Sequence, residues 1–294
     1  MNENTAYINK MTLGQKLAAY KRRPGSLIMF LLTWLAAIIT AAVVVIIVAY
    51  ILIKGIPNLK PSLFALEYNS ENVSMLPAII NTVTMTLLSL ALAVPIGVFS
   101  AIYLAEYAKR GNPLVKVVRV TTETLAGIPS IVYGLFGYLI FVIACHFGLS
   151  MLSGALTLAI MILPTMMRTT EEALLSVPDS FREGSFGLGA GRLRTVFRVV
   201  LPSAVPGILS GIILSIGRIV GETAALIYTS GTVAGIPQDL MHSGRTLSIH
   251  MYALLSEGLY MEEAYATAVV LLVMVLVINM LSGVIAKRLS AKKG

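Results

Sequence analysis

The sequence is poor in charge and contains a single cysteine. Only 12% of its 294 residues are Asp, Glu, Lys or Arg, about half of the share found in soluble globular domains. Hydrophobic residues make up 57% of the chain, and the mean hydropathy is +0.85. The lone Cys145 lies inside an apolar run and excludes a disulfide framework or a cysteine-based metal site within the chain. These values predict an integral membrane protein, for which we expect no cofactor and no metal ion.

Nucleotide-binding motifs are also missing. No GxxxxGK(S/T) sequence occurs, and Gly187, Gly189 and Gly191 depart from the GxGxxG spacing and follow no predicted strand. The net charge of +8 would suit a nucleic acid partner in a soluble protein. In a membrane protein, however, Lys and Arg report topology, because they stay on the cytoplasmic side. We therefore expect no nucleic acid partner and no ATP site on this chain.

Long uncharged runs predict an all-α protein with six transmembrane helices. Apart from His146, all 44 residues of 124–167 are uncharged, which is about twice the length that one helix needs to cross a bilayer. We expect this run to fold back as two helices with a hairpin at His146–Ser150. Helices are the expected form because backbone polar groups must pair internally in lipid. The other runs predict one helix each, at 24–53, 72–105, 199–217 with its continuation, and 264–286.

Basic residues predict that both termini are cytoplasmic. The first run is interpreted as a retained span rather than a cleaved signal peptide, because it is longer than an h-region. This gives a tail at 1–26, a six-helix domain at 27–287 and a second tail at 288–294. Only Lys54, Lys60 and Arg245 then lie outside, whereas most other basic residues lie inside: Lys10, Lys16, Lys21, Arg22, Arg23, Lys109, Arg110, Lys116, Arg119, Arg182, Arg192, Arg194, Arg198, Lys287, Arg288, Lys292 and Lys293.

The segment Phe181–Pro202 is polar, glycine-rich and basic, although strongly apolar segments flank it. Residues 178–183 have the pattern of a helix N-terminus. Ser180 is the expected N-cap, and the Glu183 side chain is expected to accept a hydrogen bond from the Ser180 N–H, as in a capping box. A second short amphipathic segment is expected at 192–200, ending at Leu201-Pro202. One interpretation is a loop on which a soluble partner docks. The alternative is a solvated loop that merely follows the positive-inside rule.

Charged residues also occur within the predicted fifth span. Arg218 and Glu222 are four residues apart, which would place both on one face of a helix. A charge at the bilayer centre costs about 2.5 to 3.5 kcal/mol on insertion scales, so both should face the bundle interior. Two interpretations fit this pair: a salt bridge that stabilises the helix, and a site through which a solute is translocated. If Arg168 also points inward, the excess positive charge suits an anion, although this side chain could equally snorkel to the surface.

The loop resembles the EAA loop in permease subunits of bacterial ABC importers. That loop has the form EAA, three residues, Gly, nine residues and Ile-x-Leu-Pro. Here residues 183–185, Gly189 and residues 199–202 stand at those spacings, with Gly184, Ser185 and Val199 as small or conservative replacements. The resemblance implies a coupling loop at 171–202 that docks on a separate ATPase subunit, where ATP is hydrolysed. The coupling residues expected there are Ser180, Glu183, Gly189, Val199, Leu201 and Pro202.

Four further stretches resemble the PstA-type permease of the phosphate-specific ABC importer, namely 125–137, 163–174, 217–231 and 247–252. The usual GETAPL appears as GETAAL, with Ala225 in the proline position. By this resemblance, Arg168, Arg218 and Glu222 match the intramembrane charged positions implicated in phosphate passage. The resemblance implies a type I ABC importer permease fold in the cytoplasmic (inner) membrane. It also implies three kinds of partner: a homologous second permease, two cytoplasmic ATPase subunits and an extracytoplasmic phosphate-binding protein.

Other functions stay open on the residues alone. Sulfate and molybdate are tetrahedral oxyanions like phosphate, and charge cannot separate them, so an ABC permease for either is the nearest alternative. An anion carrier or channel that works without an ATPase is a second alternative. A membrane scaffold or sensor that transports nothing is a third.

Overall fold

The computed structural model describes residues 24–109 and 111–291, with the side chains of residues 24 and 285–291 excepted. All regular structure in these ranges is helical, which confirms the predicted all-α class. The chain divides between Ile53 and Lys54 into two compact units, which are described separately below. The predicted domain limits lie between residues 26 and 27 and between residues 287 and 288. Both are in or next to parts of the chain that the structure does not describe, so they stay predictions.

Helix α2 (Pro24–Gly55) supplies the described part of the first unit. It contains no charged residue before Lys54, and its large apolar side chains, such as Trp34 and Val45, are exposed around the helix. A helix that is apolar on all sides is stable in lipid rather than in water. At 32 residues it would be about 48 Å long, which is more than a bilayer core requires.

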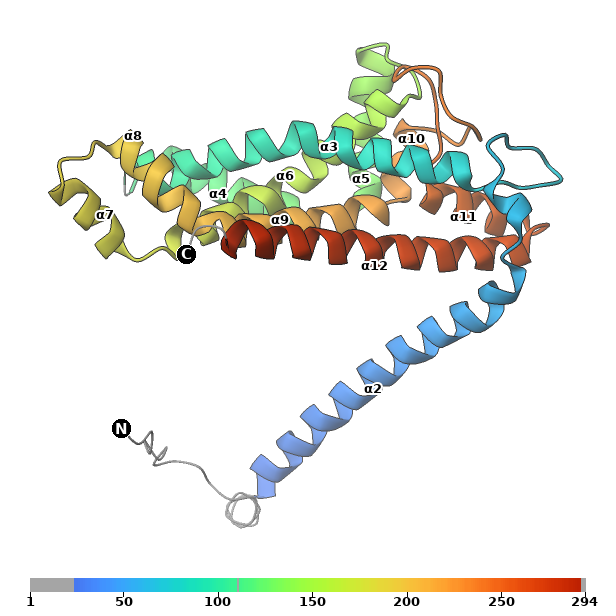
Figure 1. Cartoon of the computed structure of the whole chain (residues 1–294), viewed down its shortest axis with the longest axis horizontal. Helices are drawn as coiled ribbons and strands as arrows, with labels where there is room; N and C mark the ends of the chain where they lie inside the picture. Colours follow the sequence, from blue (N-terminus) through green and yellow to red (C-terminus); the bar gives the residue numbers. More distant parts are fainter. Residues whose placement is uncertain (1–23, 110, 292–294) are drawn as a thin grey trace. The chain divides into compact units, whose positions relative to one another are not determined.

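Four long helices of the second unit are apolar enough to cross a membrane. They are α3 (Leu76–Ile102) with a π-helical turn at Tyr103–Tyr107, α6 (Met151–Leu175), the continuous helix Arg192–Val220, and α12 (Met261–Ala291). The helix Arg192–Val220 consists of α8 (Arg192–Thr195), a π-helical segment at Val196–Val200 and α9 (Leu201–Val220). In Figure 1, α3, α6, α9 and α12 run alongside one another and form the bundle, in agreement with their backbone contacts.

The helix in the first half of the run 124–167 is short and follows another helix at a sharp bend. Helix α4 (Pro113–Ala126) meets α5 (Ser130–Gly137) and its π-helical continuation Tyr138–Ala144 at an angle of 106°. The break occurs at Gly127–Pro129, because Pro129 has no N–H for a helical bond and restricts the residue before it. The described chain therefore has five candidate spans, or six if the bent pair counts as one. The predicted hairpin is confirmed, since α6 begins at Met151 directly after His146–Ser150.

Close packing joins the bent pair to the bundle. A Cβ atom added to Gly134 of α5 would lie 2.8 Å from the Cα atom of Ala225 in α10 (Ala224–Thr229). Any side chain at position 134 would therefore push α5 and α10 apart. The core around this contact is apolar and almost inaccessible, and its fully buried members include Met85, Met151, Leu158, Ile162 and Leu226.

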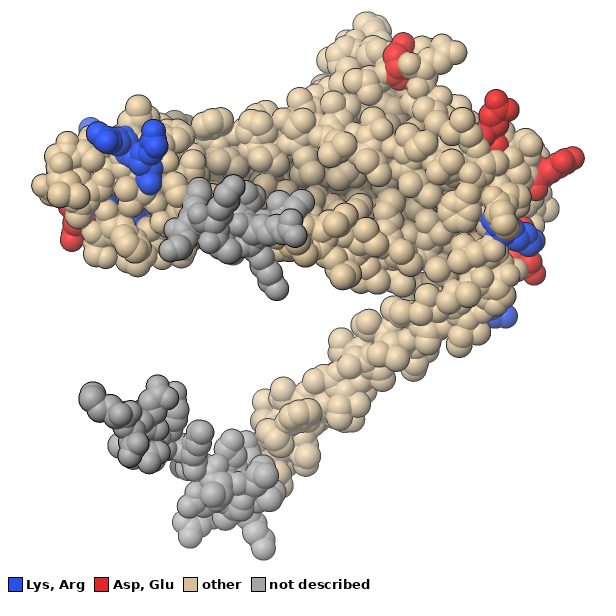
Figure 2. Space-filling view, viewed as in Figure 1, with Lys and Arg blue, Asp and Glu red and all other residues tan. Residues whose placement is uncertain are grey.

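The two ends of the bundle differ from its middle. One end carries α7 (Asp179–Gly187) and α8 and is called the α7 end, and the other carries α11 (Leu247–Glu257) and is called the α11 end. On the face shown in Figure 2, most charged side chains of the described residues lie at these two ends, one acidic side chain lies on the projection at the top of the view, and the visible surface between the ends is otherwise uncharged. An apolar belt between two charged ends is the surface expected of a bilayer-spanning bundle.

Candidate functional site

The loop at the α7 end is built from two short helices around Gly189. Helix α7 ends in a Schellman motif, in which the Gly189 N–H donates to Phe186 O at 2.9 Å and the Ala190 N–H donates to Ser185 O at 3.1 Å. Gly189 has φ +81, in the left-handed region that only glycine adopts without strain. The Ser185 and Thr195 hydroxyls, 2.8 Å apart, join α7 to α8. The glycine that the sequence spacing singled out is thus the residue that turns the chain between the two helices.

The predicted capping box at the start of α7 is wrong. The helix begins at Asp179 with Pro178 as its N-cap, and no side chain bonds to the cap. Ser180 lies one residue inside the first turn, where its hydroxyl cannot reach the free N–H groups as a cap would. The Glu183 side chain is exposed and makes no hydrogen bond or ion pair with the described residues. Position 183 is therefore free to face another molecule.

The second half of the loop also differs from the prediction. The helix that begins at Arg192 does not end at Leu201-Pro202 but continues through the π-helical segment Val196–Val200 into α9. Pro202 removes one backbone donor from this helix. The wider π turn, together with a 2.8 Å bond from Ser203 Oγ to Val199 O, lets the helix pass the proline. The loop is consequently joined to a membrane span without a break.

Large apolar side chains cover the outer face of the loop. Leu188 is 91% exposed at the tip, and four others are exposed around it. Side chains of this size in water favour contact with another protein. We call this set the apolar docking face, and it consists of Phe181, Phe186, Leu188, Leu193 and Phe197.

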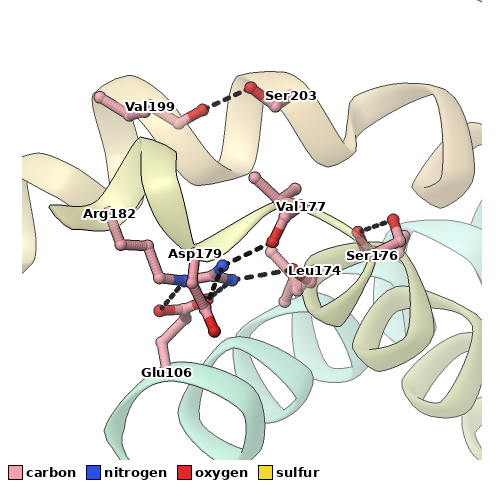
Figure 3. A network of polar contacts seen from close by, with 9 residues as sticks. Glu106, Leu174, Ser176, Val177, Asp179, Arg182, Val199 and Ser203 are labelled. Atoms are coloured by element: carbon pink, nitrogen blue, oxygen red, sulfur yellow. Dashed lines mark hydrogen bonds and ion pairs between the residues drawn. The ribbon is translucent and has the colours of Figure 1, made fainter. Parts of the chain in front are cut away.

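An arginine of α7 anchors the loop to the bundle (Figure 3). Arg182 Nη2 donates to Glu106 Oε1 at 2.6 Å, and the same guanidinium donates to Val177 O at 2.7 Å and to Leu174 O at 2.9 Å. The bond to Glu106 raises the pKa of Arg182 above its ordinary value. Sequence reasoning missed this pair, because it counted Arg182 only toward topology. The available signal was Glu106, an acidic residue that directly follows the uncharged run 72–105.

Arg218 and Glu222 do not lie on one helix, which corrects the prediction from their spacing. Helix α9 ends at Val220 and α10 begins at Ala224. Gly221 weakens the helix at the break. At the break, the Ala225 N–H donates to the Glu222 carboxylate at 3.0 Å instead of to a helical carbonyl. The backbone carbonyl of Glu222 accepts a hydrogen bond from Ser248 Oγ at 2.6 Å. The break is thus present although Ala225 stands where the related motif has proline.

The Arg218 side chain is half-buried and makes no hydrogen bond or ion pair with the rest of the described chain. It lines a cleft of about 530 Å³ between α6, α9 and α12. Polar groups from all three helices face this cleft, because Thr165 comes from α6, Ser210 from α9 and Asn279 from α12. A free guanidinium among neutral hydroxyl and amide groups is a favourable setting for an anion.

Arg168 lies in a different environment. Its side chain is 61% exposed, and Nε donates to Glu172 Oε1 at 2.9 Å. It lines a second pocket between α4 and α6, together with Arg119 and Glu171. The structure therefore does not bring Arg168 and Arg218 into one pocket, and Arg168 already has a carboxylate partner.

These features define a class of protein. A multi-pass helical bundle carries a loop with exposed apolar side chains at one end and an unpaired arginine in a cleft between its spans. Residues 93–293 match the family described as the inner membrane component of binding-protein-dependent transport systems. The chain belongs to this family, so it is a membrane permease subunit of an importer.

Relatives of known name agree with the predicted resemblance. The chain is 38% identical over 232 residues to the phosphate transport system permease protein PstA of Pasteurella multocida, covering 77% of this chain and 81% of the relative. It is 33% identical over 279 residues to the probable ABC transporter permease protein YqgI of Bacillus subtilis, covering 87% and 95%. The resemblance to PstA-type permeases is thereby confirmed.

Solved structures show the same fold. A bacterial ABC transporter for import of the acidic polysaccharide alginate matches with a TM-score of 0.62 at 17% identity, over 93% of this chain and 99% of that one. The MetNI methionine ABC transporter matches with a TM-score of 0.58 at 20% identity, over 72% and 93%. At this identity the likeness concerns the fold alone, and it confirms the predicted type I ABC importer permease fold.

Proposed function

We propose that the chain is half of the membrane passage of an ATP-driven importer for inorganic phosphate. The observation that carries the proposal is the unpaired Arg218 in a largely apolar cleft between three spans, where Thr165, Ser210 and Asn279 are the other polar residues. An arginine in the membrane is expensive unless a partner or water meets its charge. Phosphate offers oxygens that match the guanidinium fork. The phosphate transport relatives support this choice of anion over sulfate or molybdate.

The loop at the α7 end is proposed to face the cytoplasm and to dock on an ATPase subunit. Its apolar docking face supports this role, and so does the exposed Glu183 beside it. Gly189 holds the two helices of the loop in position, while Val199, Leu201 and Pro202 carry its movement into α9. Ser180 lies exposed in the first turn of α7, where it could contact the ATPase but does not cap the helix.

The other partners in the proposal complete the passage. A homologous second permease would cover the open side of the Arg218 cleft, and Gly217 leaves room for it, because a Cβ atom there would meet nothing within 4 Å. A second ATPase subunit would serve that permease, and a phosphate-binding protein would deliver the anion at the α11 end. Both termini would then be cytoplasmic, and the complex would lie in the cytoplasmic membrane.

Glu222 and Arg168 are assigned lesser roles in the same passage. The Glu222 carboxylate, at the break after α9, is proposed to limit how tightly Arg218 holds phosphate, so that the anion can leave. Arg168 is proposed to act nearer the α7 end, where its pairing with Glu172 leaves it less able to hold an anion.

Reconstitution tests the proposal. The chain would be purified with its native partners, inserted into liposomes with the binding protein outside and ATP inside, and assayed with labelled phosphate. We expect uptake that requires ATP and that excess sulfate does not reduce. Uptake without ATP would favour the stand-alone carrier, and inhibition by sulfate as strong as by unlabelled phosphate would favour the more general oxyanion permease.

A further inference from the structure

Arg182 joins three parts of the fold through one side chain. It stands on α7, and its guanidinium contacts Glu106 in the π-helical turn that ends α3, 76 residues away in the sequence. It also contacts the carbonyls of Leu174 and Val177, in the last turn of α6 and just beyond it. Figure 3 shows these bonds converging on a single guanidinium group.

No other side chain of α7 reaches α3 or α6 by a hydrogen bond or ion pair within the described residues. Asp179 bonds to Arg182 on the same helix, and Ser185 bonds to Thr195 of α8. The remaining large side chains of α7 belong to the apolar docking face. Arg182 is therefore the polar link from α7 to α3. A force applied to α7 reaches α6 both through Arg182 and through residues 176–178, which join the two helices, and it reaches α9 through α8.

The Arg182–Glu106 pair is shielded from water. The side chains are 15% and 8% exposed, although both lie at the charged end of the bundle. Both Nε and Nη2 face the carboxylate, which is the two-point geometry that only arginine provides. A pair with this burial and geometry is held far more rigidly than an exposed ion pair.

We propose that Arg182 and Glu106 form the mechanical link that transmits movement of the docking loop to α3 and α6. Helix α6 also contributes Thr165 to the Arg218 cleft, so a shift of α6 alters the cleft directly. Arg182 and Glu106 are positioning residues in this proposal, and neither contacts phosphate. The inference rests on the proposed function, because it needs an ATPase that moves the loop.

The test measures coupling in the purified complex, as phosphate imported per ATP hydrolysed in proteoliposomes. For Glu106→Gln and Arg182→Gln we expect the ATPase to co-purify and to hydrolyse ATP while import per ATP falls roughly tenfold or more. Arg182→Lys keeps the charge but loses the two-point geometry, so its import per ATP should be intermediate. The double variant should be no worse than the worse single one, because both remove the same link.

Asp179→Asn is the matched control. It removes the charge of an exposed partner of the same guanidinium, whose side chain is 77% exposed and lies 3.1 Å away, but keeps an oxygen that can accept the hydrogen bond. Import per ATP should stay within about twofold of the original.

Different outcomes overturn different claims. Variants of Glu106 and Arg182 that import normally per ATP would overturn the link alone. Loss of the ATPase from these variants, including Arg182→Lys, would also overturn it, because the pair would then serve docking. An unmodified complex that contains no ATPase or imports no phosphate would overturn the proposed function together with the link.

Discussion

Two arginines, at the α7 end and in the middle of the bundle, use the same side chain in opposite ways. Arg182 gives its guanidinium donors to Glu106, Asp179 and two carbonyls, so no further ligand has room to bind. Arg218 gives none to the described protein, although it stands between membrane spans where an unpaired charge is most costly. A saturated guanidinium holds the fold together, whereas an unsaturated one is available to a solute.

The comparison also separates burial from function. Both side chains are partly buried, so burial alone would not have distinguished their roles. The number of guanidinium N–H donors that lack an acceptor is more informative. An arginine whose donors all have partners cannot exchange them during transport without disrupting the local structure.

The largest effect is expected from neutralising the free arginine. Arg218→Gln keeps a polar side chain but removes the charge, so phosphate uptake should fall about a hundredfold or more while the complex still assembles. Labelled phosphate uptake in proteoliposomes measures the loss, and size-exclusion chromatography of the complex checks assembly.

Arg168→Gln is the matched comparison for that variant. Because Arg168 already pairs with Glu172 at an exposed site, its loss should reduce uptake by only about tenfold or less. An equal collapse of uptake in both variants would contradict the distinction between paired and unpaired arginines.

A moderate effect is expected at the turn of the docking loop. Gly189→Ala forces a side chain into φ +81, which costs about 1 to 2 kcal/mol. Because the residue has open space around it, the cost is purely one of backbone strain. The free loop can relieve this strain by leaving the left-handed turn and must readopt the turn to dock, so the affinity of the separately purified ATPase for the permease should fall by up to about 30-fold, as measured by titration in detergent.

Gly184→Ala is the control for the turn. Gly184 also has open space around it but lies inside α7 with a helical backbone, so alanine should stabilise the helix by about 0.5 to 1 kcal/mol. ATPase affinity that is unchanged by Gly189→Ala, or that is lost equally in both variants, would show that the Schellman turn does not shape the docking face.

An effect on stability alone, and not on transport, is expected from a buried histidine at the α11 end. Burial, together with the nearby positive charge of Arg245, lowers the pKa of His250 to about 3. Since the folded protein resists protonation, stability should be full above about pH 6.5 and should decline as the pH falls below it, by about 2 kcal/mol at pH 5.

Thermal unfolding of the purified complex at pH 7 and pH 5 measures this decline. His250→Phe should flatten it, because phenylalanine has no group that titrates in this range. The phenylalanine ring can keep the edge contact with Tyr68, whose ring lies 6.2 Å from that of His250. A pH dependence that survives in the variant would assign the titration to another group.

Hydropathy and spacing predicted the parts of the fold that local chemistry controls. The spans follow from runs of apolar residues, and Gly189 was identified by its position in the EAA-loop spacing, where the structure has a left-handed turn. The helical start near Ser180 was placed within one residue, but its cap was not. Pro178 occupies the N-cap position, and only the path of the chain out of α6 decides that.

Tertiary structure controls the parts that the sequence could not predict. The i, i+4 spacing of Arg218 and Glu222 indicated one helical face, but Glu222 instead bonds to the Ala225 N–H and to Ser248, which ends α9. The Glu106–Arg182 pair spans 76 residues, and no local spacing reports such a contact. The bend after α4 was marked by Pro129, although its angle depends on the packing of Gly134 against Ala225.

Solvent access to the Arg218 cleft is the measurement that tests the central claim most directly. In a Cys145→Ser background, which removes the exposed native thiol, Ser210→Cys places a thiol in the cleft and Leu87→Cys places one on the apolar outer side of α3. We predict that a negatively charged, membrane-impermeant thiol reagent modifies position 210 but not position 87, and that phosphate slows the reaction. Equal protection of both thiols would mean that Arg218 lies beside lipid, and that result would contradict the account.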